Sequence, residues 1–542
     1  MERFVFAGLC ASALLLIRPG AAQAPDTIDS DWRESGTCYE IFVRSFYDSD
    51  GDGIGDLEGL IEKLDYVNDG DPASRTDLGA SCIWLMPINP SSGYHGYDVT
   101  DYYRVDPEYG TSEDFERLIE AAHRRGIRVI LDMVINHVSS EHPFFQYALL
   151  YPDSPYRSWF RWSESPGPPN EWGGVNWHRS PYREEYYYGF FSPSMPDLNW
   201  ETPAVREEMK KVATFWLDEM GADGFRLDAV RHLMEDSTRT ANVPRTHDML
   251  REYAAYIRRV APGAFTIGEV YDSTDVLLAY YPDQLDAYFA FQVSDAILAA
   301  VWTGSARGLL ASVLELQKAV PNDRWSPFLR NHDQTRTMTW LEGDVARAKL
   351  AASLLLTLPG LPFVYYGEEI GMTGDKPDPR LRTPMQWGPS PAAGFTAGVP
   401  WEPLQPDSFT ASVEALNDDP ASLLNHYRTL IHLRSATPAL GAAGELVPLD
   451  AGIGQVAAYF RRRGDQVALV VANLGARRLD GVALSSAPGA LPSGGYTPRD
   501  LLGRQSASPL QVGANGQLRE YVPLTRLAPL SAYIFQVSGG ER

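Results

Sequence analysis

The chain has 542 residues, of which 44% are hydrophobic and 22% charged, a composition typical of folded globular proteins and not of collagen-like, low-complexity or disordered chains. Its 47 basic and 70 acidic residues give a net charge of -23, which would repel a phosphate polyanion and disfavours nucleic-acid binding. At about 100–200 residues per domain, the length predicts two to four domains unless one is a large barrel.

Residues 1–24 have the pattern of a signal peptide. Arg3 supplies a positive charge, residues 4–17 are almost wholly apolar, and Ala22-Gln23-Ala24 forms a cleavage site with small residues. The apolar run is shorter than the about 20 residues that a membrane span needs. We therefore expect a protein that is exported to the periplasm or the medium and has no membrane span.

Eight short apolar runs follow one another along the chain, and amphipathic helices separate them. Such runs, apolar on both faces, are typical of parallel strands, and eight in succession indicate a (β/α)8 TIM barrel in the α/β class. An open doubly wound sheet is disfavoured, because no glycine-rich phosphate-binding sequence follows the first strand. The predicted strands are 39–46, 82–88, 127–135, 221–230, 264–271, 287–293, 325–331 and 362–368, and clear helices lie at 113–126, 203–220 and 345–358.

Two segments depart from this alternation and predict further domains. The interval between the third and fourth predicted strands is longer than the other intervals, and residues 139–200 within it are rich in Pro, Trp and Tyr. We expect them to form an excursion domain (domain B) whose rings either make its own core or stack on carbohydrate. Residues 441–542 contain strand-like runs without helices, which predicts an antiparallel β-sandwich domain. The barrel is then divided between 29–138 and 201–440.

Cys38 and Cys82 are the two cysteines beyond the signal peptide. Export would permit a disulfide between them. Each also begins an apolar run, where a buried thiol is equally natural. The sequence leaves both possibilities open.

Charged and polar residues stand where the predicted barrel strands end, which is where barrel enzymes place their chemistry. Arg226 precedes Asp228 by two residues and so faces the same way. A single carboxylate at such a place is commonly a helix cap or an ion-pair partner, but three at one rim indicate a catalytic site. The strand ends carry, in chain order, Asn136-His137, Asp228, Glu269 and His332-Asp333.

Three acids without a metal-binding cluster among them suit glycosidic-bond cleavage, in which one carboxylate attacks the anomeric carbon and a protonated one donates to the leaving oxygen. Asp228 is the better nucleophile, because Arg226 beside it favours the ionised form. Glu269 has a longer side chain and an apolar approach, which favours the protonated form and suits an acid/base. Asp333 would bind sugar hydroxyls or stabilise the oxocarbenium-like transition state.

The stretches DMVINHV, GFRLDAV, IGEV and FLRNHD occur in this order and resemble the four conserved stretches of the α-amylase family of retaining glycoside hydrolases. The resemblance covers nearly the whole chain after the signal peptide. It implies Asp228 as nucleophile, Glu269 as acid/base and Asp333 as transition-state stabiliser, together with α stereochemistry. It also implies that the sugar at the point of cleavage is bound by His137, Arg226, His332 and the stacking ring of Tyr97, with His95 and Asp98 beside that ring.

Residues 48–56, DSDGDGIGD, alternate acids with tight-turning glycines, a pattern that suits a hard cation such as Ca2+. A solvated acid-rich turn is the alternative. The loop is similar to one found in a branch of the same family, and that resemblance implies a structural Ca2+ held by Asp48, Asp50, Asp52, Asp56 and the carbonyl of Ile54.

Further motifs bear on the reaction. MPDLNW (195–200) resembles the group intermediate between oligo-1,6-glucosidases and neopullulanases, and Arg231-His232 resembles the pair that contacts the leaving-side sugar in α-amylases. RTPMQW (382–387) is instead shared with α-glucosidases and trehalose synthases. We expect an exported hydrolase of α-1,4 bonds in starch and maltooligosaccharides. The alternatives are an exo-acting α-glucosidase or oligo-1,6-glucosidase and, third, a transglycosylase or trehalose synthase; the three acids disfavour a non-catalytic family member.

Overall fold

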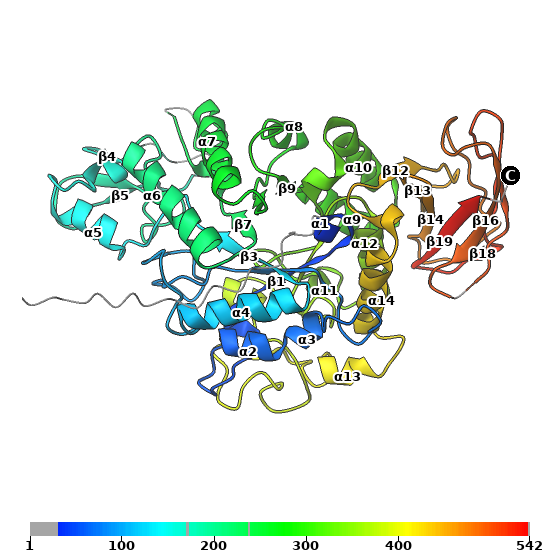
Figure 1. Ribbon diagram of the computed structural model, residues 1–542, viewed down its shortest axis with the longest axis horizontal. Coiled ribbons are helices and arrows are strands. Elements are labelled where there is room, and N and C mark those ends of the chain that lie inside the picture. The colour runs from blue at the N-terminus through cyan, green and yellow to red at the C-terminus, as the bar shows by residue number, and fades with distance from the viewer. Residues whose placement is uncertain (1–30, 168, 170–172, 237–238, 504, 540–542) are drawn as a thin grey trace, which may run out of the picture.

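A computed structural model describes residues 31–539 except 168, 170–172, 237–238 and 504 (Figure 1). The predicted signal peptide lies outside the described residues. Helices and a central parallel sheet make up the larger part, and an antiparallel sheet near the C-terminus lies at one end (Figure 1). Among the described residues, none of the helices combines the length and the apolar character needed to span a bilayer.

The eight predicted strands form one parallel sheet, which confirms the barrel. Its order is β10-β9-β8-β7-β3-β2-β1-β11, and the N–H of Phe363 donates to the carbonyl of Pro327 at 2.9 Å, which links the two outer strands. The strands are shorter than the apolar runs that predicted them. They are β1 (Cys38–Ile41), β2 (Cys82–Leu85), β3 (Arg128–Met133), β7 (Gly224–Leu227), β8 (Phe265–Gly268), β9 (Ala287–Phe289), β10 (Trp325–Ser326) and β11 (Phe363–Tyr365).

Helices cover the outside of the barrel. In α4, the side chain of Thr111 accepts from the N–H of Asp114 while Asp114 accepts from the N–H of Thr111, a capping box that fixes the helix start. The apolar face of α4 is buried through Phe115, Leu118 and Ala122. The helices of six or more residues around the barrel are α2 (Leu57–Glu62), α4 (Ser112–Arg124), α6 (Pro203–Thr214), α7 (Pro244–Val260), α9 (Phe291–Thr303), α10 (Arg307–Ala319), α12 (Val345–Thr357) and α14 (Leu423–Ser435). Shorter helices are α1 (Asp31–Ser35), α3 (Leu64–Val67), α8 (Thr274–Leu278), α11 (Thr337–Trp340) and α13 (Val413–Asn417).

Alternate residues of the strands fill the barrel interior. Trp84, Ile130 and Ile267 belong to one buried apolar cluster there. The cluster also contains Cys38 and Cys82, which are register partners on β1 and β2 and form a disulfide with a Cα–Cα distance of 4.4 Å. The structure thus selects the disulfide over two separate thiols.

A small unit lies beside the end of β3, within the segment 139–200, of which 168 and 170–172 fall outside the described residues. Helix α5 (Pro143–Leu150) packs against a three-stranded antiparallel sheet of β4 (Trp162–Ser163), β5 (Trp177–Arg179) and β6 (Tyr186–Tyr188). The ring of Phe145 lies 4.9 Å from that of Tyr187 and 5.0 Å from that of Phe160, so many of the aromatic residues make the unit's own core. The MPDLNW segment returns the chain to the barrel, where the N–H of Leu198 donates to the carbonyl of Asn136 at 2.8 Å.

The C-terminal sheet is antiparallel, as predicted, with the order β12-β13-β14-β19-β16-β17. One face packs on the barrel, where the hydroxyls of Tyr459 and Thr357 lie 2.7 Å apart, and the other face has its own core with Leu469 and Phe535. The strands are β12 (Glu445–Pro448), β13 (Val456–Arg463), β14 (Gln466–Asn473), β16 (Gly494–Asp500), β17 (Leu510–Val512) and β19 (Ser531–Gly539), and the pair β15 (Leu479–Asp480) and β18 (Arg526–Leu527) lies apart from this sheet.

Candidate active site

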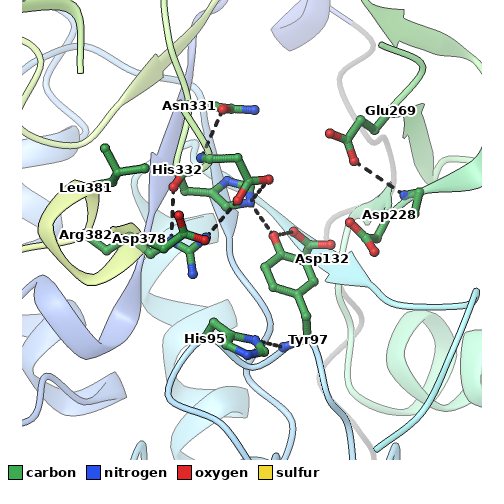
Figure 2. Close-up of polar contacts among 12 residues, drawn as sticks. His95, Tyr97, Asp132, Asp228, Glu269, Asn331, His332, Asp378, Leu381 and Arg382 are labelled. Atoms are coloured by element: carbon green, nitrogen blue, oxygen red, sulfur yellow. Dashed lines mark hydrogen bonds and ion pairs between the residues drawn. The ribbon is translucent and has the colours of Figure 1, made fainter. Parts of the chain in front are cut away.

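The three predicted acids meet at one rim of the barrel, because parallel strands present their carboxyl ends at the same face. Asp228 directly follows β7, Glu269 directly follows β8, and Asp333 lies beyond β10. Ala229 has left-handed backbone geometry, with φ of 48°, and its N–H lies 3.4 Å from Oε2 of Glu269. Figure 2 shows Asp228 and Glu269 on one side of the site, with Asp378 and Arg382 on the other.

One buried guanidinium, that of Arg226, holds the acids together. Its Nη1 donates to Oδ1 of Asp132 at 2.8 Å and to Oδ1 of Asp228 at 2.7 Å. Its Nη2 donates to Oε2 of Glu269 at 2.8 Å. Only 1% of Arg226 is exposed, so one positive charge is shared among three carboxylates with little help from water.

Arg226 favours the ionised form of Asp228, as predicted, but it does not outweigh the other effects on this carboxyl group. Burial raises the pKa of Asp228 to about 8; Arg226 opposes the rise, but the charges of Glu269, Asp132 and Asp333 add to it. The apolar approach to Glu269 is present, since Phe265 and Ile267 belong to the buried apolar cluster, but the carboxylate itself contacts the guanidinium of Arg226. A two-residue spacing showed that Arg226 faces Asp228, but not that other acids compete for its charge.

Asp333 lies between two cationic groups. Its Oδ1 accepts from Nη2 of Arg382 at 2.7 Å, and its Oδ2 lies 3.2 Å from Nε2 of His332. Although burial alone would raise it, the His332 imidazole and the Arg382 guanidinium hold the pKa of Asp333 far below its usual range. Burial would likewise lower the pKa of His332, but Asp333 and Glu40 raise it to about 10. Asp333 is therefore ionised at neutral pH.

The ring of Tyr97 forms the floor between these groups. It stacks on His332 with a centroid distance of 5.5 Å and an interplanar angle of 15°, and its hydroxyl donates to Oδ2 of Asp132 at 2.9 Å. His95 stacks on the other side at 6.1 Å. Asp98 lies behind, where it accepts from the N–H of Gly93 at 3.0 Å, so its carboxylate supports the turn that carries Tyr97.

The remaining two predicted sugar-binding histidines are neutral, because burial lowers the pKa of His137 to about 3 and that of His232 to about 4. Nε2 of His137 lies 3.1 Å from the carbonyl of Tyr97. His232 follows Asp228 by one turn and stacks on Phe190 at 4.0 Å. Both rings are therefore uncharged at the walls of the pockets described below.

A pocket of about 310 Å³ opens at this rim, a size that suits a small ligand. A second pocket of about 420 Å³ shares Phe191, Ala229 and Glu269 with it, so the two make one continuous cleft past the acids. Arg226, His332 and Asp98 are not among the lining residues and act from behind. The first pocket is lined by His95, Tyr97, His137, Phe191, Ser192, Met195, Asp228, Ala229, Glu269, Asp333, Asp378 and Arg382, and the second also contains Arg231, His232, Tyr271 and Asp272.

Sequence reasoning missed three charged residues of this site and derived no role for a fourth, Arg382. Glu40 and Asp132 lie at inward positions of β1 and β3, where an acid inside an apolar strand was the available signal. Arg382 begins the RTPMQW motif, and Asp378 begins the short 3-10 helix Asp378–Leu381 that precedes it. Asp378 Oδ2 lies 3.6 Å from Nη2 of Arg382, so the pair forms one wall of the pocket.

The predicted calcium loop lies away from this cleft. The carboxylates of Asp48, Asp50 and Asp56 come together, with one ligand atom from each within 4.8 Å of the others, which fits a divalent cation. Asp52 is outside this group, and its Oδ1 accepts from the N–H of Ile54 at 2.7 Å. Although burial alone would raise it, hydrogen bonds from Thr396 and backbone N–H groups lower the pKa of Asp48, which favours its charged form.

This chain is similar to known proteins in sequence and in overall structure. Residues 40–443 match the family model described as Alpha amylase, catalytic domain. "Alpha-amylase 3" of Dictyoglomus thermophilum is 40% identical over 451 residues, which cover 82% of this chain and 85% of that protein. "Trehalose synthase/amylase TreS" of Mycolicibacterium smegmatis is 37% identical, and the matched region covers 80% of this chain and 81% of that protein. The crystal structure of the α-amylase from H. orenii superposes on this chain with a TM-score of 0.80 and 39% sequence identity. The match covers 92% of this chain and 99% of that one.

Proposed function

Because the chain belongs to the α-amylase family, we propose that it is an exported retaining hydrolase of α-1,4-glucosidic bonds in starch and maltooligosaccharides. The observation that carries this proposal is the placement of Asp228 and Glu269 on the two terminal nitrogens of Arg226, with Asp333 across the same pocket. Retaining glycosidases need two carboxyl groups close enough for one to attack the sugar directly.

The charges of the site suggest how the proton is used. Double displacement needs a charged Asp228 to attack the anomeric carbon and a proton on Glu269 for the leaving oxygen. The raised pKa of Asp228 supplies one proton to this pair near neutral pH, and both carboxylates contact the same guanidinium. We infer that Asp228 attacks in its ionised form and that Glu269 acts as the acid/base. Asp333 keeps its charge and stabilises the positive charge that develops on the sugar ring.

The cleft has features of two kinds of α-glucan enzyme. The second pocket, with the exposed ring of Tyr271 and with Arg231 and His232, offers room for sugars on the leaving side, which favours action on chains. Exo-acting α-glucosidase is the second candidate, because the charged pair Arg382–Asp378 in the pocket wall suits the hydroxyls of a chain end.

A comparison of two substrates tests this proposal. We expect a higher kcat/KM for a maltooligosaccharide blocked at its non-reducing end than for an aryl α-glucoside, and preference for the aryl glucoside would favour the exo-acting candidate. Asp228→Asn should abolish both activities. The matched control is Asp223→Asn, which changes a partly buried acid at the opposite end of β7 and should leave kcat intact; turnover by Asp228→Asn would refute the assignment.

Export is supported by the signal-peptide pattern of residues 1–24 and by the disulfide between Cys38 and Cys82, since disulfides persist mainly in oxidising compartments. The test is N-terminal sequencing of the protein from the secreting host. A new terminus near residue 25, in the periplasmic or medium fraction, is expected, whereas an intact Met1 in the cytoplasm would contradict it.

We further propose that residues 48–56 hold a structural Ca2+ through Asp48, Asp50 and Asp56, with Asp52 and the Ile54 carbonyl as the remaining predicted ligands. The loop contacts the segment that follows RTPMQW, since Gly53 accepts from the N–H of Trp401 at 2.9 Å. Trp401 in turn donates to Oγ of Ser45 at 3.0 Å. A cation would neutralise close acids and stabilise this connection.

Chelation tests the metal proposal. We expect EDTA to lower the melting temperature by about 5 °C, and metal analysis to find about one Ca2+ per chain before treatment. Asp50→Asn should abolish both effects. Asp71→Asn, in another acid-rich exposed turn, is the control and should retain them. An unchanged melt with no bound metal would refute the site.

A further inference from the structure

Glu40 is an acid inside the barrel that the proposed reaction does not use. It lies on β1, points inward and is only 2% exposed. Its Oε1 lies 2.5 Å from Nδ1 of His332, the residue directly before Asp333. A buried carboxylate is costly unless it is paired, so this contact needs an explanation.

The hydrogen bonds around His332 fix its protonation. Nδ1 faces the carboxylate of Glu40, which accepts a hydrogen. Nε2 faces Oδ2 of Asp333 at 3.2 Å and the hydroxyl oxygen of Tyr97 at 2.6 Å. The hydroxyl hydrogen of Tyr97 is already donated to Asp132, so this oxygen also accepts. This geometry suits a ring with hydrogen on both nitrogens, and although burial opposes it, the charges of Asp333 and Glu40 favour that cationic form.

The position of the His332 ring is also fixed by its neighbours. The side chain of His332 is fully buried, stacks on Tyr97 and lies 5.6 Å from the ring of Trp84. Its backbone carbonyl accepts from Nε of Arg382 at 3.1 Å. The charged or titratable groups that surround it from all packed elements are Glu40, Tyr97, Asp132, Arg226, Asp333 and Arg382.

We propose that Glu40 is a positioning residue, which anchors Nδ1 of His332 so that the Nε2–H group holds Asp333 in the geometry that the reaction needs. Glu40 lies behind His332 and does not line the pocket, so it acts through His332. Without the charge of Glu40, the imidazole keeps Asp333 but loses one of the two carboxylates that favour its second proton. The positive charge beside Asp333 would then be lost at a lower pH, and Arg382 would remain. The kinetic part of this proposal rests on the role proposed above for Asp333.

Glu40→Gln removes the charge and keeps the shape, so it is the variant of choice. The matched control is Glu369→Gln, which neutralises another fully buried glutamate that accepts from Tyr39 and Tyr66 away from the pocket. NMR of the histidine Cε1–H groups, over a pH series, reads the charge of His332 without any substrate. Kinetics on a maltooligosaccharide give kcat, KM and their pH dependence.

In the unsubstituted protein we expect the His332 signal to remain that of a protonated ring up to about pH 9. In Glu40→Gln it should titrate below that pH, with kcat reduced about tenfold, KM changed less than about threefold, and activity lost at a lower pH. Glu369→Gln should match the unsubstituted protein in all of these readouts.

Three results would overturn the proposal. One is a His332 signal that titrates near the ordinary histidine value in the unsubstituted protein, a measurement that needs no variant to fold. The second is a Glu40→Gln protein that melts earlier but keeps its kcat and its pH profile. The third is an equal effect of Glu369→Gln. A chain with no activity on any α-glucoside would refute the proposed function instead, and the NMR titration would still decide the role of Glu40.

Discussion

Replacing Arg226 by Lys keeps the buried charge but removes the geometry that joins the acids. The guanidinium donates to Asp132, Asp228 and Glu269 through two nitrogens at 2.7–2.8 Å. A single ammonium cannot occupy both positions. If one of the three bonds survives, two charge-assisted hydrogen bonds are lost, at about 1.5–3 kcal/mol each. A loss of about 3 kcal/mol in the transition state lowers kcat/KM on the order of 100-fold.

The assay is kcat/KM on a maltooligosaccharide, with circular dichroism and thermal melting to confirm folding. Arg434→Lys is the matched control, because Arg434 is also fully buried but donates to the carbonyls of Leu356, Leu358 and Gly360 near the C-terminal sheet. The control should lose stability and keep its kcat. A folded Arg226→Lys protein with kcat/KM within about threefold of the original would refute the idea that one guanidinium organises the acids.

Three further outcomes are expected. Because burial raises the pKa of Asp228 to about 8 and the reaction needs one proton on the Asp228–Glu269 pair, kcat/KM should fall as the pH rises above about 8; a profile flat to pH 10 would contradict this. Tyr97→Phe removes the hydroxyl between His332 and Asp132 and keeps the stacking ring, so kcat should fall about tenfold or more while KM changes little. An unchanged kcat in steady-state kinetics would show that the ring alone matters. Glu368 is buried, and its pKa is raised from 4.5 to about 7, so its contribution to stability is complete below about 4.5 and is lost as the pH rises through 7. Glu368→Gln should therefore increase stability by up to about 3 kcal/mol at pH 8 and have little effect at pH 4.5, which melting curves at the two pH values can check.

The fold was predictable because burial on both faces leaves a direct record in the sequence. Each barrel strand is an apolar run, and the alternation within it indicates which side chains point inward, as with Arg226 and Asp228. The same alternation places Glu40 inward on β1, between Cys38 and Phe42, but a lone acid there carries no sign of its partner. That partner, His332, is 292 residues away and meets it only when the barrel closes.

The protonation states of the site residues were less predictable than the identity of those residues. The pKa of Asp228 depends on burial and on acids from other strands, and local spacing reveals neither. Arg382 lies in a loop after the last strand, where no periodicity indicates direction, so its contact with Asp333 was invisible in the sequence. The pairing of Cys38 with Cys82 likewise depends on the register of β1 against β2.

The account depends most on Asp228 as the group that bonds to the sugar. Glu269→Gln, treated with a 5-fluoro α-glycosyl fluoride, should accumulate the covalent intermediate, because the second step then lacks its base. Peptide mapping by mass spectrometry should find the added glycosyl group on the peptide that contains Asp228, bonded to its carboxylate. A glycosyl group attached to any other residue would contradict the mechanism.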